Sequence, residues 1–433
     1  MVGEITMKKY ILNSLLVASV LFVASCKPEI ESPAGTTAGS ANFSKYIAVG
    51  NSLTSGFADG GLYLEGQKVA YPNLMAEKMA TVGGGSFTSP FFTDAQANGS
   101  GYLSLTALVN GVPTLTPVTT NLAYRDATRL AKYTGEVQNL GIPGMRVDLA
   151  FAGPFGAANP YLERLLPDAQ VGVTSYFQFI QGRSHTFFSL WLGNNDALGY
   201  ATNGGVTTDA TNVLTDKSTF ALLYSNLVNS LSAGGQKGIV ATIPDVTAIP
   251  YFNTVTVAAL LNAAKAINPA AAAIYIQTGT GTVRAATSED LIRLPFQSAG
   301  LFGSTTSSPY PYGLHPLNPI ANNWVLDKDE VAKVKDYVIS YNNSIKSLAD
   351  SKGLAIADTY AYLNQVKTGI IINGIGINSA FITGGAFSLD GVHLTPRGNA
   401  VIANVFINAI NAKYGSTIPV VDVTQYRGVK FPN

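Results

Sequence analysis

Short apolar runs alternate with longer stretches of helical period along most of this chain. The apolar runs of strand length are Tyr46 to Val49, Thr186 to Leu192, Gly238 to Ile243 and Leu354 to Ala357. In the stretches between them, apolar side chains recur every three or four residues, as they do on one face of a helix. Such alternation is typical of a parallel sheet that helices cover on both faces. The pattern therefore predicts an α/β protein.

Three of the helical stretches have clear boundaries. One covers Ser218 to Ser232, and its apolar stripe comprises Phe220, Leu223, Tyr224, Leu227, Val228 and Leu231. A second stripe, from Val331 to Leu348, begins among Asp327 and Asp329 and closes at Lys352-Gly353, as capping and the helix dipole favour. The third helix follows Pro396, which suits a first helical turn, and runs to about Tyr414. We interpret all three stripes as core.

The distribution of Pro, Gly, Ser and Thr indicates how the chain is organised. Residues 27–42 are rich in these types and in Ala, which predicts a flexible tether, and one domain follows over residues 43–433. Residues 83–133 show no sustained period and are interpreted as an insertion near the site. Residues 300–323 carry several prolines and are interpreted as an inserted surface loop.

The first 26 residues are typical of an export signal. Lys8 and Lys9 precede an apolar run from Tyr10 to Val23, and Ala24-Ser25-Cys26 follows. The stretch resembles a bacterial lipoprotein signal, which would be cleaved before Cys26 so that this residue takes up lipid. The alternative is an ordinary secretory signal with an incidental cysteine. The resemblance implies a lipid-anchored location in the cell envelope, periplasmic or outer-membrane, with surface exposure left open.

Composition excludes several classes of function. The chain has 433 residues, of which 47% are hydrophobic and 12% charged, so a large buried core is expected. Its 27 basic and 26 acidic residues give a net charge of +1, and no Lys/Arg cluster indicates nucleic-acid binding. Because Cys26 is the only cysteine, internal disulfides and cysteine-based metal sites are excluded.

A serine and a histidine at opposite ends of the chain are candidates for catalysis. Ser52 follows the first predicted strand directly, at the edge where parallel sheets bind ligands, although a serine there is also a common helix cap. Far along the chain, Asp390 lies three residues before His393. At that spacing a carboxylate can accept the Nδ1–H bond of the ring and direct Nε2 toward a serine. Asp-x-x-His alone is a weak motif.

Two further segments contain donors that an acyl-transfer site needs. Asn195 follows the predicted strand that ends at Leu192, and its amide can hydrogen-bond a developing oxyanion. In Asn139-Leu140-Gly141-Ile142-Pro143-Gly144, the Gly141 N–H can approach the same oxygen. Taken singly, both segments also read as ordinary turns.

Together these four segments resemble the SGNH, or GDSL-like, hydrolase family, in the family's order and with comparable separations. The resemblance implies a flavodoxin-like α/β/α sandwich with a central parallel sheet. It implies that Ser52 is the nucleophile, that Asp390 and His393 complete the triad, and that Ser52, Gly141 and Asn195 form the oxyanion hole. Ala70 to Leu74, followed by a short helix, also matches the family. Asn51 departs from it, because the family has Asp at that position.

The function that the resemblance implies is hydrolysis of carboxylic esters through an acyl-enzyme, with no metal or organic cofactor. Its members act on lipids, small alcohols or acylated sugars, so the expected partner is a small-molecule or lipid ester. Thr54 occupies the place of the second glycine of a G-x-S-x-G elbow, which disfavours the α/β-hydrolase superfamily. The alternative is a surface lipoprotein that keeps the fold and binds glycan or lipid without hydrolysis.

Overall fold

A five-stranded parallel sheet forms the centre of the computed structural model, which describes residues 35–109 and 111–432. Its strand order is β11-β6-β5-β1-β4. The strands are β1 (Tyr46–Gly50), β4 (Asn139–Gly141), β5 (Phe187–Trp191), β6 (Lys237–Ala241) and β11 (Ala355–Ala357). Counted along the chain from the β4 edge, this is the 2-1-3-4-5 order of flavodoxin-like sheets.

The central strands are short and almost wholly buried. All five residues of β1 and all five of β5 are buried, as expected for parallel strands covered on both faces. Four of the five strands coincide with the predicted apolar runs, and the ends differ by one or two residues. The fifth, β4, is three residues long and was not predicted. The predicted α/β class and its central parallel sheet are confirmed.

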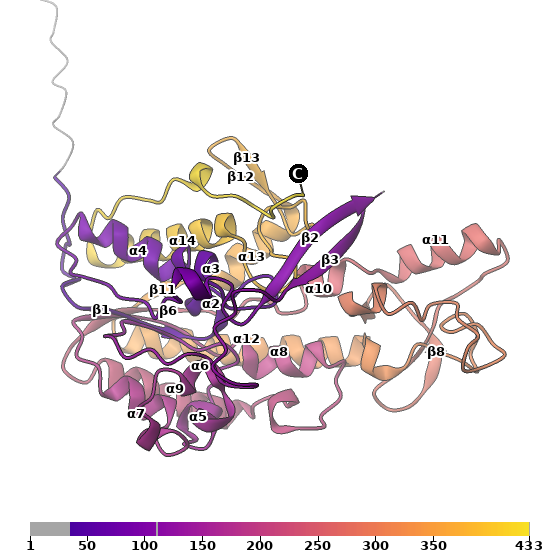
Figure 1. Cartoon of the computed structure of the whole chain (residues 1–433), viewed down its shortest axis with the longest axis horizontal. Coiled ribbons are helices and arrows are strands. Elements are labelled where there is room, and N and C mark those ends of the chain that lie inside the picture. Colours follow the sequence, from indigo (N-terminus) through magenta and orange to yellow (C-terminus); the bar gives the residue numbers. More distant parts are fainter. Residues whose placement is uncertain (1–34, 110, 433) are drawn as a thin grey trace, which may run out of the picture. The chain divides into compact units, whose positions relative to one another are not determined.

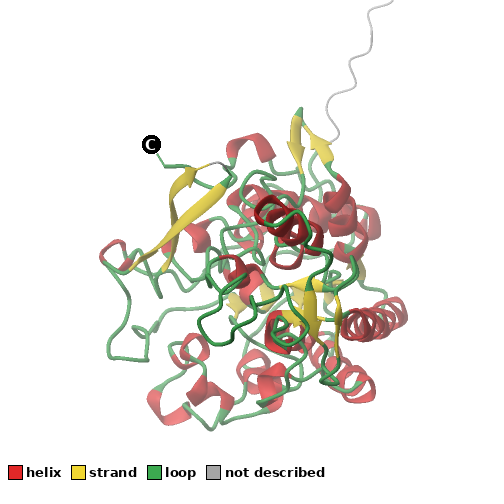
Figure 2. Cartoon of the chain, turned by 90° about the vertical axis from the view of Figure 1, so that its right-hand side faces the viewer, coloured by secondary structure: helices red, strands yellow, loops and turns green. Residues whose placement is uncertain are grey.

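Helices cover both faces of this sheet (Figure 1; Figure 2). The helices α4 (Tyr71–Ala80), α13 (Thr359–Thr368) and α14 (Pro396–Tyr414) pack on one side, and α7 (Tyr176–Gln181), α9 (Lys217–Leu231) and α12 (Lys328–Ser351) pack on the other. The other described helices are α2 (Ser52–Ser55), α3 (Leu64–Lys68), α5 (Phe155–Ala158), α6 (Pro160–Glu163), α8 (Asn195–Thr202), α10 (Pro250–Asn253) and α11 (Val257–Ile267). The result is a three-layer α/β/α sandwich.

The three predicted helices begin and end where the sequence indicates. Asp327 caps α12 in a reciprocal capping box with Glu330, and α14 begins at Pro396 and ends before Gly415, which has φ of +65°. The segment from Ala70 to Leu74 precedes no separate helix, because Tyr71 already begins α4.

Within residues 35–109 and 111–432, four antiparallel strand pairs and seven 3-10 turns lie outside the central sheet. Three of the pairs are hairpins: β2 (Tyr102–Val109) with β3 (Val112–Val118), β7 (Tyr275–Gln277) with β8 (Val283–Ala285), and β12 (Ile370–Ile372) with β13 (Ile375–Ile377). The fourth pairs β9 (Leu291–Ile292) with β10 (Val325–Leu326), which lies farther along the chain. The 3-10 turns are η1 (Asp94–Gln96), η2 (Leu149–Phe151), η3 (Asp168–Gln170), η4 (Ala210–Asn212), η5 (Leu294–Gln297), η6 (Asn322–Trp324) and η7 (Val423–Gln425). The β2–β3 hairpin lies in the stretch 83–133, for which no periodic element was predicted.

The stretch 300–323 is irregular, as the sequence indicates, but it is not only surface. Ile320 is buried there and joins a second apolar cluster with Ile276 and Phe296, separate from the core around the central sheet. This cluster lets a proline-rich segment pack without forming helices or long strands.

The folded body begins earlier than Phe43. The Thr37 N–H donates to Thr417 Oγ1 (2.8 Å), the Ser40 N–H donates to the Tyr414 carbonyl (2.9 Å), and Ala41 is buried. These bonds use carbonyl and hydroxyl groups at the end of α14, so residues 37–42 belong to the body rather than to the predicted tether. The predicted signal, Cys26 and the tether up to residue 34 lie outside the described residues.

A helix that crosses a bilayer needs about 20 predominantly apolar residues. Among residues 35–109 and 111–432, none of the helices is both long enough and apolar enough to cross a membrane.

Candidate active site

Ser52 lies where β1 ends and α2 begins. A Cβ at Gly50 would come within 2.1 Å of Thr54 Oγ1 and 2.6 Å of the Trp191 carbonyl oxygen, so only glycine allows the chain to turn this sharply. The helix cap is Asn51, whose Oδ1 accepts the Leu53 N–H at 3.1 Å. Asn51, and not Ser52, therefore caps α2, and the Ser52 hydroxyl is free for another partner.

That partner is His393. Ser52 Oγ lies 2.9 Å from His393 Nε2, and His393 Nδ1 lies 2.8 Å from Asp390 Oδ2. Ser52 lies just after the first strand of the sheet and His393 in the loop before α14, 341 residues away. The structure thus brings together all three residues of the predicted triad, in the order that general-base activation of a serine requires.

Asp390 is held by five hydrogen-bond donors. Its Oδ2 accepts from the His393 ring and from the Gly60 N–H (2.8 Å). Its Oδ1 accepts from the backbone N–H groups of Val392 and His393 and from the Ser388 hydroxyl (3.1 Å). Burial alone raises the pKa of this carboxyl, but the charge of His393 and these hydrogen bonds outweigh burial and hold the pKa well below its usual range. Asp390 is therefore ionised whenever His393 can act as a base.

A second carboxylate, Asp59, fastens the loop that carries Asp390. Asp59 Oδ1 accepts the Leu389 N–H at 2.8 Å, its Oδ2 accepts the Tyr63 hydroxyl at 2.6 Å, and its own N–H donates to Ser388 Oγ at 2.9 Å. The residue has φ of +54°, which is uncommon for a side chain other than glycine. Burial raises its pKa, and the nearby charge of Asp390 acts in the same direction. The sequence reasoning missed Asp59.

Asn195 is the first residue of α8, at the end of β5. Its Nδ2 donates one hydrogen to the Met145 carbonyl at 2.9 Å, which leaves the second hydrogen of the amide available. Asn195 and Ser52 line the same cavity. The structure therefore places the Asn195 amide at the site, as predicted.

The prediction for Gly141 does not agree with the structure. Its N–H donates to Asn139 Oδ1 at 3.1 Å, so it is not available to an oxyanion. Gly144, three residues later, has φ of +78°, and no described residue accepts its N–H. It adjoins Met145, which the Asn195 amide contacts. In this turn Gly144 is thus a better candidate donor than Gly141.

The Ser52 N–H is also unpaired. It lies in the first turn of α2, where backbone N–H groups have no partner within the helix. Within the described ranges, no group accepts it. A substrate oxygen beside Ser52 Oγ would meet this donor and the Asn195 amide together, as an oxyanion hole requires.

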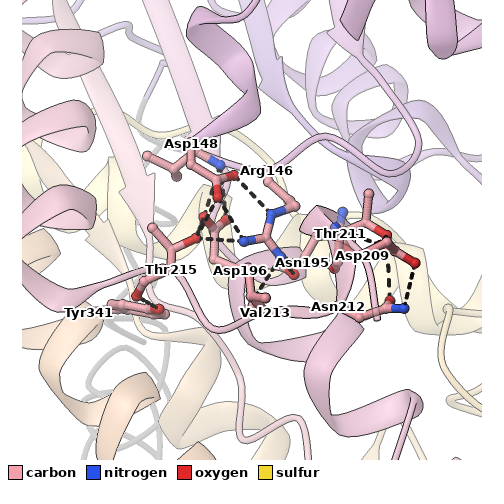
Figure 3. Close-up of polar contacts among 11 residues, drawn as sticks. Arg146, Asp148, Asn195, Asp196, Asp209, Thr211, Asn212, Val213, Thr215 and Tyr341 are labelled. Carbon is pink, nitrogen blue, oxygen red and sulfur yellow. Dashed lines mark hydrogen bonds and ion pairs between the residues drawn. The ribbon is translucent and has the colours of Figure 1, made fainter. Parts of the chain in front are cut away.

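A buried arginine supports the two loops that carry these donors (Figure 3). Arg146, only 1% exposed, forms a bidentate pair with Asp148 (2.8 Å for both bonds) and donates to the Asn195 carbonyl at 3.2 Å. It also donates to the Thr211 and Val213 carbonyls (3.0 and 2.9 Å). The guanidinium thereby joins the turn at 142–148 to the start of α8.

Asp196 completes this network. Its carboxylate accepts the Val147 N–H at 2.9 Å and the Thr215 hydroxyl at 2.7 Å, and Thr215 is also bonded to Arg146. Burial is the main reason that its pKa rises to about 6, and the Asp148 charge raises it further while Arg146 opposes the rise. Asp196 holds the 142–148 turn against α8 but bonds neither Ser52 nor His393. Sequence reasoning assigned no role to Arg146 or Asp196.

The cavity at Ser52, which we call the inner cavity, has a volume of about 40 Å³. Its polar members are Asn51, Ser52, Asn194, Asn195 and His393. Its apolar walls are Leu53, Trp191, Leu198, Pro244, Val246, Ile249, Leu363, Phe387, Val392 and Leu394. A small apolar chamber thus adjoins the hydroxyl of Ser52 and the amide of Asn195.

The other two histidines have structural partners. His185 contacts the carbonyls of Arg183 and Leu231 through its two ring nitrogens, at 3.0 and 2.8 Å. His315 Nδ1 accepts the Leu317 N–H, and its ring stacks on Tyr310 with a centroid distance of 4.0 Å. In the part of the chain that the structure describes, no three His, Cys, Asp or Glu side chains are grouped to hold a metal ion.

Comparisons with known proteins give only distant likenesses. No family model matches the chain, and no curated protein matches it. An acetyl-xylooligosaccharide esterase from Geobacillus is 11% identical, with a TM-score of 0.37, and the alignment covers 86% of this chain and 96% of that one. An alpha/beta hydrolase from the metagenome of Lake Arreo, Spain, is 12% identical, with a TM-score of 0.37 and coverage of 86% and 97%. An extracellular lipase from Streptomyces rimosus is 11% identical, with a TM-score of 0.33 and coverage of 84% and 98%. Because these scores are below 0.5, the assignment of fold and site rests on the geometry of this chain itself.

Proposed function

We propose that this protein is a serine esterase of the SGNH type, with Ser52 as nucleophile, His393 as general base and Asp390 as the residue that orients His393. The observation that carries the proposal is the continuous contact from Ser52 Oγ to His393 Nε2 (2.9 Å) and from His393 Nδ1 to Asp390 Oδ2 (2.8 Å). An imidazole held between a serine and an ionised carboxylate has the arrangement that nucleophilic acyl transfer needs.

The proposed reaction has two halves. His393 Nε2 takes the Ser52 proton as Oγ attacks the ester carbonyl, and the imidazolium then protonates the departing alcohol as the C–O bond breaks. In the second half, His393 takes a proton from water as the water attacks the acyl-Ser52 ester. The imidazolium then returns this proton to Ser52 Oγ as the acyl C–O bond breaks and the carboxylic acid leaves. The Ser52 N–H, the Asn195 amide and the Gly144 N–H are the donors that we assign to the oxyanion in both halves.

The anchoring of the protein is a separate proposal. It rests on the sequence around Cys26 alone, where an apolar run ends in Val-Ala-Ser-Cys. We propose that lipid on Cys26 holds the folded body at a bacterial envelope membrane, where a lipid or small-molecule ester is its substrate. Metabolic labelling with a fatty-acid analogue, compared between the natural chain and Cys26→Ala, tests this, and equal labelling of the two would contradict it.

Turnover of p-nitrophenyl acetate tests the catalytic proposal. Ser52→Ala removes the nucleophile, so hydrolysis should fall to the rate without protein. Ser344→Ala, which replaces a half-buried serine on α12, is the matched control and should hydrolyse at the natural rate. Unchanged turnover in Ser52→Ala would exclude Ser52 as nucleophile. A natural protein that hydrolyses no ester would favour a binding protein on the same scaffold.

A further inference from the structure

The inner cavity is too small for a long acyl chain. Its volume of about 40 Å³ leaves room for roughly three water-sized groups. An acetyl or propionyl group fills such a space, and an octanoyl chain exceeds it. The walls that set this limit come from different elements: Trp191 ends β5, Val246 and Ile249 lie in the segment after β6, and Leu363 lies on α13.

A much larger groove lies beside the inner cavity. This outer groove has a volume of about 690 Å³, in the range of sites that hold a whole ligand rather than one substituent. Its lining combines the polar side chains of Lys367, Asn378, Ser379 and Thr383 with the apolar side chains of Leu108, Pro113, Phe381 and Ile382. Hydroxyl, amide and ammonium groups interspersed with apolar side chains suit a molecule that carries both hydroxyl groups and apolar C–H surface.

Two segments line both cavities. On α13, Leu363 lines the inner cavity and Lys367, one helical turn later, lines the outer groove. In the same way, Ile249 precedes α10 and lines the inner cavity, and Asn253 ends α10 and lines the outer groove. Leu108 of β2 and Pro113 of β3 form another wall of the groove.

We infer that this site hydrolyses short-chain acyl esters of a large polar alcohol, such as an acetylated oligosaccharide, with the acyl group in the inner cavity and the alcohol along the outer groove. The inference rests on the proposed esterase function and specifies its substrate. A long-chain lipid ester would place its bulk on the side of Ser52 that has the least room.

A chain-length series tests the acyl half of the inference. The kcat/KM for p-nitrophenyl acetate should exceed that for the octanoate by at least about tenfold, because the longer chain must displace the cavity walls. Leu363→Ala enlarges the cavity and should raise the octanoate-to-acetate ratio. Leu348→Ala, a half-buried leucine on α12 away from both cavities, should leave this ratio at its natural value.

The results of this series distinguish failure of the substrate inference from failure of the proposed esterase function. A preference for octanoate over acetate that Ser52→Ala abolishes would keep the esterase and overturn the inference. Hydrolysis of no ester, or hydrolysis that Ser52→Ala leaves intact, would overturn the proposed function itself. An unchanged octanoate-to-acetate ratio in Leu363→Ala would also contradict the inference, since the cavity walls would then not determine which acyl chains are accepted.

A second variant tests the alcohol half. Thr383→Trp places a bulky ring in the outer groove at an exposed position. The ratio of kcat/KM for partially acetylated cello-oligosaccharides to that for p-nitrophenyl acetate should fall about tenfold or more, because the larger alcohol needs the groove. Ser347→Trp, on the exposed face of α12, is the matched control. An unchanged ratio in Thr383→Trp, with released acetate as the readout, would contradict the assignment of the groove.

Discussion

Asp390, which is half-buried, and Asp196, which is fully buried, both lie near the carboxyl ends of the central strands, yet their pKa values shift in opposite directions. Five hydrogen-bond donors, one from the His393 ring, surround the Asp390 carboxylate, and its pKa lies well below the usual range. Asp196 receives the Val147 N–H and the Thr215 hydroxyl, and burial raises its pKa to about 6. Burial raises the pKa of both carboxyls, but only at Asp390 do a neighbouring charge, that of His393, and several hydrogen-bond donors outweigh burial.

The difference separates two roles within one site. Asp390 contacts the base and must carry charge to orient and stabilise it. Asp196 contacts no residue of the triad and acts as a positioning residue, because with Arg146 and Thr215 it holds the loop of Asn195. Substitutions of Asp390 and of Asp196 should therefore differ in how much activity they remove and in which kinetic step they affect.

The largest effect is expected at Asp390. Asp390→Asn keeps the shape but cannot accept the Nδ1–H bond as a carboxylate does, so kcat for p-nitrophenyl acetate should fall by about 10⁴. Asp196→Asn leaves the triad intact, and its loss should stay below about 10² because only the position of Asn195 changes. Equal losses in the two variants would mean that the two carboxylates do not have separate roles.

A smaller loss is expected at the oxyanion donors. Asn195→Ala removes one amide donor and should lower kcat by about 10² to 10³, with KM changed much less. Asn194→Ala is the matched control, since the adjacent asparagine lines the same cavity and no described residue bonds its Oδ1. A larger loss in Asn194→Ala than in Asn195→Ala would transfer the donor role to Asn194.

The two carboxylates should also give stability of opposite pH dependence. Because the pKa of Asp196 is raised, its contribution is fully present below pH 4 and is lost as pH rises toward 6, by of order 3 kcal/mol. The lowered pKa of Asp390 does the reverse: its contribution is present above pH 4 and is lost as pH falls. Urea unfolding from pH 4 to 7 should show Asp196→Asn gaining stability relative to the natural chain as pH rises. A constant difference between the two would contradict the raised pKa.

The smallest effect is expected at Asn51. The Asn51 side chain accepts the Leu53 N–H through Oδ1, a bond that an aspartate also makes. Asn51→Asp should therefore change kcat/KM by less than about threefold, whereas Asn51→Ala, which removes the cap, should cost about 1 kcal/mol of stability in the same unfolding assay. A much larger increase in kcat/KM in Asn51→Asp would show that the absence of an aspartate charge at position 51 limits the activity of this enzyme.

Local patterns in the sequence were sufficient for four of the five central strands, whereas the triad was expected only because four segments together resemble a known family. The strands β1 and β5 are uninterrupted apolar runs, and Ser52 and Asn195 follow them closely, so their position at one edge of the sheet was predictable. Asp390 and His393 are three residues apart, and their contact needs only a tight loop. These features depend on neighbours in the chain, and periodicity and spacing detect such features.

The remaining parts depend on contacts between distant residues. Asp59 meets Leu389 across 330 positions, and Arg146 meets Asn195 and Thr215 across 49 and 69. Gly141 was expected to be a donor because the sequence does not show that Asn139 Oδ1 occupies the Gly141 N–H. The β2–β3 hairpin was not predicted because β3 contains Pro113 and Pro117. Proline is tolerated in a strand with one unpaired edge, but it obscures the strand pattern in the sequence.

The most direct test of the central claim is to locate the adduct of a fluorophosphonate. Trypsin cleavage after Lys45 and Lys68 releases one peptide that contains Ser52, and fragmentation in the mass spectrometer distinguishes Ser52 from Ser55 within it. The account predicts stoichiometric modification of Ser52 that depends on His393 and is lost in His393→Ala. An unmodified Ser52, or an adduct on another residue with hydrolysis retained, would contradict it.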